Sequence, residues 1–95
     1  MRRLTMFEYN ICTNADISVF TNQCLALEMH IPGLQKGELL CDVDGSAIQK
    51  YVLDGRRITV YNDEQIDAVF VESEIPLEKY FSRQVASLEM LVEGA

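Results

Sequence analysis

Polar and apolar positions alternate in the first part of the chain and then change to a helical spacing. Within residues 4–12, Phe7, Tyr9 and Ile11 recur at every second position, which is the period of a half-buried β-strand. Apolar residues then recur every three or four positions, as on one face of an α-helix; they are Ile17, Phe20, Cys24, Leu27 and Ile31. The pattern predicts a strand and then a helix over about residues 15–29.

The residues that flank this helix predict its ends. Thr13 and Asn14 are favourable N-cap residues, and Asp16 would lie in the first turn, where the helix dipole favours an acid. Pro32 and Gly33 would stop the helix.

A strand over residues 24–31 is the competing interpretation. Four apolar residues there also alternate; they are Leu25, Leu27, Met29 and Ile31. The N-cap residues favour the helix, and the strand stays open as an alternative.

From Glu38 onward the pattern is that of four antiparallel strands. Short runs of strand-forming residues cover 38–43, 47–53, 56–61 and 66–72. Two Asp-Gly pairs, Asp44-Gly45 and Asp54-Gly55, separate the first three runs. Asp-Gly between alternating runs is typical of tight type I′ hairpin turns, because those turns need positive φ.

The last part of the chain predicts a second helix, over residues 77–92. Pro76 suits the first turn of a helix, and Gly94 would end it. Its apolar stripe has steps of three or four and consists of Leu77, Tyr80, Phe81, Val85, Leu88 and Val92. The order β-α-β-β-β-β-α predicts one α+β domain over residues 1–95, with both helices on one face of the sheet.

Composition and charge narrow the possible functions. The chain has 95 residues, of which 48% are hydrophobic, and this is ordinary for one globular domain. Its net charge of −7 opposes binding to nucleic acids and to anionic membranes, and the Arg56-Arg57 pair is too small a basic patch to reverse this. No apolar run approaches the roughly 20 residues of a membrane span. We therefore expect a cytoplasmic protein that binds neither nucleic acid nor membrane.

The cysteines and the single histidine do not form a metal-binding pattern. Cys12, Cys24 and Cys41 are widely spaced among apolar neighbours, and His30 has no ligand partner at metal-site spacing. We expect three buried free thiols, no metal and no cofactor. His30 is expected to be a cation at the end of the first helix, although Cys41 or Asp42 beside it would allow acid–base chemistry.

Residues 39–48 contain the motif Asp42-x-Asp44-Gly45-Ser46 after an apolar run. This motif resembles the nucleophile loop of the haloacid dehalogenase superfamily of phosphatases. The resemblance implies that Asp42 attacks phosphorus, that Asp44 acts as acid and base, and that Mg²⁺ lies between them. That loop follows a parallel strand, whereas the residues after Ser46 predict the return strand of a hairpin. We interpret Asp44-Gly45 as a turn and expect no catalytic residues.

A run of acids suggests a binding surface instead. Six acids lie within residues 63–78, a stretch that contains no Lys or Arg. Charge complementarity would direct such a surface to a basic protein, and tyrosines are frequent interface anchors. The candidate partner-binding residues are Tyr61, Asp63, Glu64, Asp67, Glu72, Glu74, Glu78 and Tyr80.

The sheet face away from the helices is a second candidate interface. We expect it to be too apolar for a solvated surface, so that a second copy covers it in a homodimer. The residues assigned to this dimer interface are Leu40, Tyr51, Leu53, Tyr61, Val69 and Val71.

These features favour a small acidic protein-interaction module. We expect a bacterial immunity, antitoxin or inhibitor type of protein, which covers a basic partner surface. One alternative is a secretion-type chaperone that binds a client segment. A second alternative is a small enzyme with a site near His30.

Overall fold

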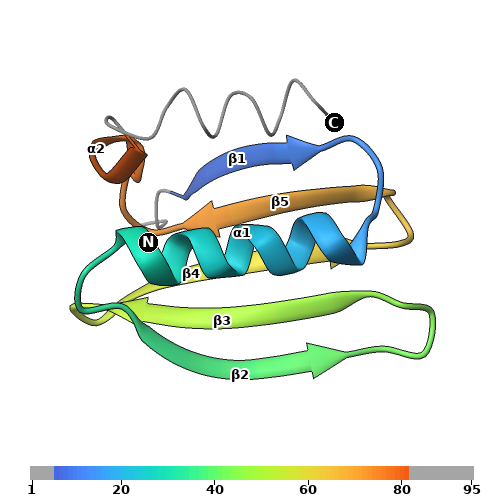
Figure 1. The fold of residues 1–95 in the computed structure, drawn as a ribbon, viewed down its shortest axis with the longest axis horizontal. Helices are drawn as coiled ribbons and strands as arrows, with labels where there is room; N and C mark the ends of the chain where they lie inside the picture. Colours follow the sequence, from blue (N-terminus) through green and yellow to red (C-terminus); the bar gives the residue numbers. More distant parts are fainter. Residues whose placement is uncertain (1–5, 82–95) are drawn as a thin grey trace, which may run out of the picture.

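Five antiparallel strands form one sheet in the order β1-β5-β4-β3-β2 (Figure 1). The computed structural model describes residues 6–81. Its elements are β1 (Phe7–Cys12), α1 (Ile17–His30), β2 (Gln35–Cys41), β3 (Ala47–Leu53), β4 (Arg56–Asp63), β5 (Ala68–Ser73) and α2 (Glu78–Phe81). The α+β class is confirmed. The four later strands form a meander, and β1 extends the sheet by pairing with β5.

Helix α1 begins later than the sequence predicts. Its N-cap is Asp16, whose Oδ1 accepts hydrogen bonds from the N–H groups of Ser18 (2.9 Å) and Val19 (3.3 Å). Asp16 is therefore not a first-turn residue, and Thr13 and Asn14 lie in the preceding loop. A carboxylate that caps two N–H groups is a strong start signal, which explains why it prevails over Thr13. Residues 24–30 are helical, so the alternative strand is wrong.

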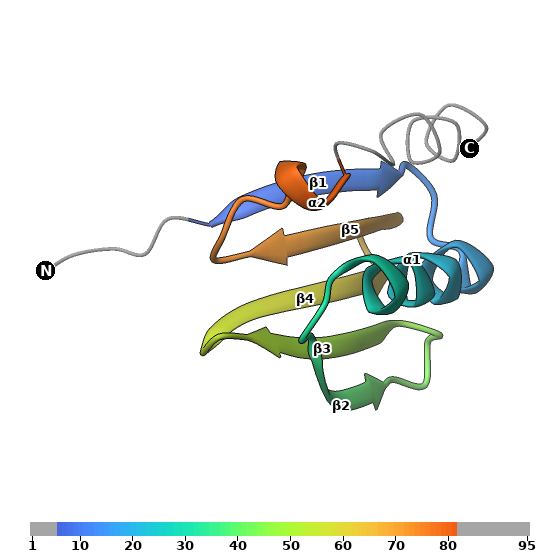
Figure 2. The same cartoon turned by 60° about the vertical axis from the view of Figure 1, so that its left-hand side comes forward.

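The core lies between α1 and one face of the sheet. Figure 2 shows α1 on one side of the strands. Phe20, Cys24 and Leu27 are the buried apolar residues of this helix. Beneath them the strands contribute buried residues at every second position, including Tyr51, Leu53, Ile58, Val60, Val69 and Val71. We call this the helix-side face and the opposite one the outer face.

Cross-strand register places one apolar row on the outer face. Leu40 pairs with Ile48, Ile48 with Tyr61, and Tyr61 with Phe70. The rings of Tyr61 and Phe70 stack with centroids 4.7 Å apart and an interplanar angle of 13°. We call Leu40, Ile48, Tyr61 and Phe70 the outer row. It crosses the four strands β2, β3, β4 and β5.

The assignment of faces from the sequence is wrong for four of the six proposed dimer residues. Leu40 and Tyr61 lie on the outer face. The other four are buried on the helix-side face; they are Tyr51, Leu53, Val69 and Val71. The error arises because successive side chains alternate between faces, so a shift of one residue exchanges the whole set. The homodimer itself stays a prediction.

The two Asp-Gly turns differ in type. Asp54 and Gly55 both have positive φ, 52° and 79°, as a type I′ turn requires. In the other turn only Gly45 does (97°), and the N–H of Asp42 donates to the carbonyl of Ser46 at 2.8 Å. The interpretation of Asp44-Gly45 as a hairpin turn is confirmed, but the type I′ prediction is wrong there. The loop has three residues, with Gly in the left-handed position.

Valine at either of these glycines is expected to destabilise the fold by about 1–3 kcal/mol, because a β-branched residue resists positive φ. At Gly55 a Cβ atom would meet no neighbour within 4 Å, so the cost there is backbone strain alone. At Gly45 it would also lie 3.2 Å from Glu64 Oε2. Urea unfolding of Gly55→Val against Gly55→Asn checks this, since asparagine tolerates positive φ. Equal stability of the two variants would contradict the strain argument.

The second predicted helix is described only at its beginning. α2 covers Glu78–Phe81, and Leu77 just before it is fully buried. The side chain of Phe81 and the predicted stripe residues Val85, Leu88 and Val92 lie outside the described part.

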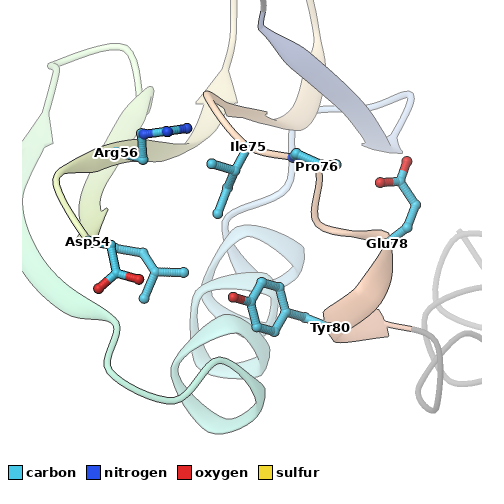
Figure 3. A pocket seen from close by; sticks show the side chains of 7 residues that line it. Asp54, Arg56, Ile75, Pro76, Glu78 and Tyr80 are labelled. Atoms are coloured by element: carbon cyan, nitrogen blue, oxygen red, sulfur yellow. The ribbon is translucent and has the colours of Figure 1, made fainter.

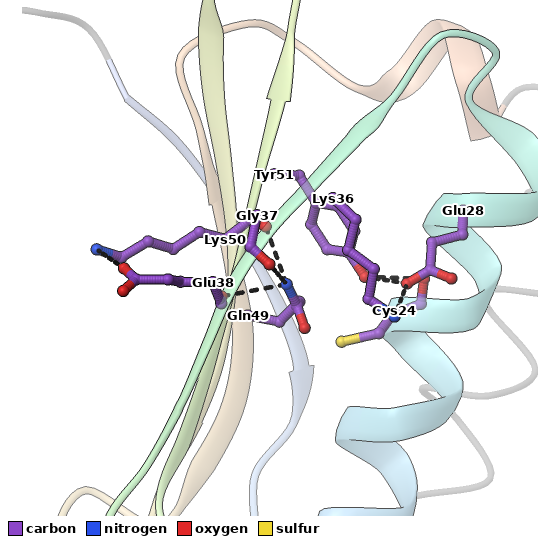
Figure 4. Close-up of polar contacts among 8 residues, drawn as sticks. All are labelled: Cys24, Glu28, Lys36, Gly37, Glu38, Gln49, Lys50 and Tyr51. Atoms are coloured by element: carbon purple, nitrogen blue, oxygen red, sulfur yellow. Dashed lines mark hydrogen bonds and ion pairs between the residues drawn. The ribbon is translucent and has the colours of Figure 1, made fainter.

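The side chain of Gln49 bonds to backbone carbonyls of β2 and β3 (Figure 4). Gln49 is buried, and its Nε2 lies 3.0 Å from the carbonyl oxygens of Gly37 and Lys50 and 3.1 Å from that of Glu38. These carbonyls flank a register shift between Lys36 and Leu39, where the strand ladder is interrupted. The amide therefore satisfies acceptors that a bulge leaves unpaired.

Tyr51 links this sheet to α1. Its hydroxyl donates to Glu28 Oε2 at 2.6 Å and lies 3.4 Å from the carbonyl oxygen of Cys24. Lys36 Nζ lies 3.2 Å from the same Glu28 oxygen. The hydrogen bond from Tyr51 is the main reason that the pKa of Glu28 lies below its ordinary value. Burial, and then the bond to Glu28, raise the pKa of Tyr51.

Candidate functional site

Two hairpin loops are joined at one end of the sheet. Asn62 Nδ2 donates to the carbonyl of Gly45 at 3.2 Å, and the N–H of Glu64 donates to Ser46 Oγ at 3.0 Å. These bonds connect the β2–β3 loop with the β4–β5 loop. Asn62 is buried, and its Oδ1 accepts from the N–H of Asp16, so the start of α1 lies at the same end.

A small acidic hollow lies between these loops. Its volume is about 230 Å³. It is lined by Asp42, Asp44, Ser46, Ile48, Tyr61, Asn62, Asp63 and Gln65, and we call this set the acidic hollow. Ile48 and Tyr61 belong to the outer row, so the carboxylates adjoin its apolar surface. The hollow therefore combines three acids with two apolar side chains.

Backbone hydrogen bonds position each of the three carboxylates. Oδ1 of Asp42 accepts from the N–H of Val43 at 2.7 Å, and Oδ1 of Asp44 from that of Ser46 at 2.9 Å. Oδ1 of Asp63 accepts from the N–H groups of Gln65 (2.9 Å) and Ile66 (3.2 Å). Within residues 6–81 none of the three forms an ion pair. Their negative charge is thus held in place without a neutralising cation there.

The eight residues predicted to bind a partner do not form one surface. Tyr61 and Asp63 line the acidic hollow, and the Glu64 side chain lies over Gly45 beside it. Tyr61 donates to Glu72 at 3.1 Å on the outer face, and Asp67 Oδ1 accepts from the N–H of Ala15.

The remaining three lie toward the opposite end of the sheet. Glu74 accepts a hydrogen bond from the backbone N–H of Arg57 at 2.7 Å and forms an ion pair with its guanidinium at 3.1 Å. The backbone bond, and then the side-chain bond, keep the pKa of the Glu74 carboxyl below the ordinary value. Glu78 accepts from the hydroxyl of Tyr9 at 3.0 Å, while Tyr80 lines a different hollow. A dense run of acids in sequence is therefore dispersed by the antiparallel strands.

Sequence reasoning missed Asp42 and Asp44 as members of a charged site, because they were assigned to a turn alone. The order of the predicted strands could have indicated that these residues belong to the site. Loops that follow β2 and β4 of a meander lie at the same end of the sheet, so Asp42 and Asp44 belong beside Asp63.

His30 and Asp42 lie toward opposite ends of the sheet. His30 occupies the last turn of α1, as predicted. The helix has 14 residues, about 20 Å, and starts at the end of the sheet where Asp42 lies. Cys41 and Asp42, whose proximity to His30 the sequence left open, therefore lie toward the other end of the sheet.

The cysteines differ in their surroundings. Cys24 is buried, but Cys12 is half-buried and Cys41 is exposed, so the prediction of three buried thiols is wrong for two. All three are free thiols. Across the described residues, no three His, Cys, Asp or Glu side chains are placed to hold a metal ion.

A second hollow, of about 550 Å³, lies at the other end of the sheet. Figure 3 shows Asp54 and Arg56 on one side of it, Glu78 and Tyr80 on the other, and Ile75 and Pro76 between them. Leu53 completes its lining, and we call this set the Arg56 hollow.

Comparisons with known proteins assign no family to this chain. No protein-family model, curated protein or solved structure matches it. Among the described helices, none is long and apolar enough to cross a membrane.

Proposed function

We propose that this protein is a cytoplasmic protein-interaction module that binds a basic segment of another protein in the acidic hollow. The observation that carries the proposal is the meeting of Asp42, Asp44 and Asp63 beside Ile48 and Tyr61. These residues come from two hairpins that the Asn62–Gly45 bond joins.

Electrostatics supports a cationic ligand for this hollow. The three carboxylates are held by turn hydrogen bonds, so little side-chain entropy is lost when a cation binds between them. The whole chain carries a net charge of −7, which adds a long-range attraction for basic partners and raises their association rate.

The outer row supplies apolar contact next to this charge. Ile48 and Tyr61 line the hollow, and Leu40, which is 42% exposed, continues the row to the sheet edge. A lysine or arginine would enter among the carboxylates while an apolar neighbour packs on the row. This combination matches the inhibitor or immunity type of function, in which an acidic protein covers a basic surface.

Affinity capture with charge variants tests this function. The triple variant Asp42→Asn, Asp44→Asn, Asp63→Asn removes three negative charges and retains the side-chain oxygens that accept the turn hydrogen bonds. Wild-type protein is expected to capture basic proteins from the native lysate at about 50 mM salt and to release them at about 300 mM, because salt screens the attraction. The triple variant is expected to lose them.

A matched control removes the same charge elsewhere. Glu8→Gln, Glu38→Gln, Asp54→Asn changes three exposed acids outside the acidic hollow and is expected to retain the partners. Quantitative mass spectrometry compares the three samples. If the hollow variant and the control lose partners equally, net charge alone is responsible, and the assignment of the site is refuted.

A further inference from the structure

The Arg56 hollow has the size and mixed lining of a small-molecule site. Its volume, about 550 Å³, falls within the range of typical ligand pockets. It lies between the β3–β4 turn and the segment that leads into α2, at the end of the sheet opposite the acidic hollow. It is thus independent of the proposed partner-binding site.

One wall carries two opposite charges, and neither forms an ion pair within the described residues. Asp54 and Arg56 flank Gly55 in the type I′ turn, and neither forms an ion pair or a side-chain hydrogen bond there. The neighbouring Arg57 differs, because its guanidinium is bound to Glu74. Asp54 and Arg56 therefore present one anion and one cation, two residues apart, to the hollow.

The rest of the lining is mainly apolar. Leu53 is buried beneath the wall, and Ile75 and Pro76 lie between the two sides (Figure 3). The aromatic ring of Tyr80 stands opposite Asp54 and Arg56. A ligand that fits must have an apolar body and, at one end, charges of both signs.

We infer that the Arg56 hollow binds a free α-amino acid with a large apolar side chain. The carboxylate of the ligand pairs with Arg56, and its ammonium group pairs with Asp54. The side chain packs on Ile75, Pro76 and Tyr80. A purely anionic ligand is disfavoured by Asp54, by Glu78 on the opposite wall and by the net charge of −7, whereas a zwitterion is not.

Titration with L-leucine tests this inference, followed by amide chemical shifts of the ¹⁵N-labelled full chain. Saturable shifts are expected in the amide signals of residues 53–56, 75 and 77–80. Isocaproate lacks the ammonium group and isoamylamine lacks the carboxylate, so each is expected to bind about tenfold more weakly, as is usual when one charge-assisted contact is lost.

Charge variants of the wall complete the test. Arg56→Gln and Asp54→Asn are each expected to weaken leucine binding about tenfold. Asp54→Asn leaves the turn intact, because asparagine also tolerates the positive φ of residue 54. Arg56→Gln leaves it intact because residue 56 does not have a positive φ. Arg57→Gln is the matched control and is expected to bind as the wild type does. Absence of saturable shifts, shifts outside the hollow, or unchanged binding in Arg56→Gln would overturn the inference.

Discussion

Replacing Gln49 by glutamate is expected to destabilise the protein by about 3–5 kcal/mol at neutral pH, the usual cost of an unpaired buried charge. The two side chains have nearly the same shape, so packing is conserved. Glutamate, however, would place a carboxylate oxygen where Nε2 now lies about 3 Å from the carbonyls of Gly37, Glu38 and Lys50. The three carbonyl oxygens would then face a carboxylate oxygen, with no N–H group to donate a hydrogen bond between them.

Urea unfolding at neutral and acidic pH checks this result. Burial against carbonyls favours the protonated form of the new carboxyl group, so the folded state of the variant binds a proton more tightly than the unfolded state. The penalty is therefore expected to shrink as the pH falls. Gln35→Glu makes the same change at an exposed position of β2 and should be nearly neutral. Equal costs at Gln49 and Gln35 would contradict the role of the amide at the bulge.

Replacing Tyr51 by alanine is expected to cost about 3–5 kcal/mol, because the side chain is almost completely buried between β3 and α1. Against a typical domain stability of about 5–15 kcal/mol, this change alone could unfold much of the protein. Tyr51→Phe retains the ring and removes the hydroxyl, and should cost about 1–3 kcal/mol through the bond to Glu28.

Two measurements separate these contributions. Urea unfolding gives the free energies of Tyr51→Ala and Tyr51→Phe. NMR titration of the Glu28 carboxyl should show a pKa below the ordinary value in the wild type and a higher one in Tyr51→Phe. Because a lowered carboxyl pKa stabilises the fold above the unfolded-state pKa, this contribution is lost as the pH falls through the folded-state pKa. An unchanged pKa in Tyr51→Phe would show that another group, such as Lys36, lowers it.

Because Tyr51 is buried, a substitution at this residue does not test the predicted homodimer. A charged residue there would unfold the protein and would say nothing about association. Ile48→Glu, on the outer row, is the informative substitution.

The order and type of the described elements could be predicted because the signals were local. The alternation of Phe7, Tyr9 and Ile11 and the two Asp-Gly turns depend only on neighbouring residues. The position of the turn at Asp44 was predicted, but its type was not. The type of this turn depends on how Asp42 and Ser46 close the hairpin. Helix α1 begins later than predicted, because the carboxylate of Asp16 is a better N-cap than the hydroxyl of Thr13.

The candidate site could be predicted only in part because it depends on which loops meet. Asp63 was identified from the density of acids, but that density says nothing about the direction of side chains. Asp67 turns to the N–H of Ala15 and Glu74 to Arg57, so neither joins Asp63. Long-range contacts between loops, rather than spacing along the chain, determine the composition of the acidic hollow.

The most direct test of the central claim is a titration of the ¹⁵N-labelled protein with two short peptides, one containing lysine and leucine and the other containing glutamate and leucine. The lysine peptide is expected to shift the amides of residues 42–48 and 61–65. These shifts should disappear in the variant Asp42→Asn, Asp44→Asn, Asp63→Asn and persist in Glu8→Gln, Glu38→Gln, Asp54→Asn. Shifts of equal size with the glutamate peptide, or shifts that survive in the hollow variant, would contradict the claim that the acidic hollow binds basic segments.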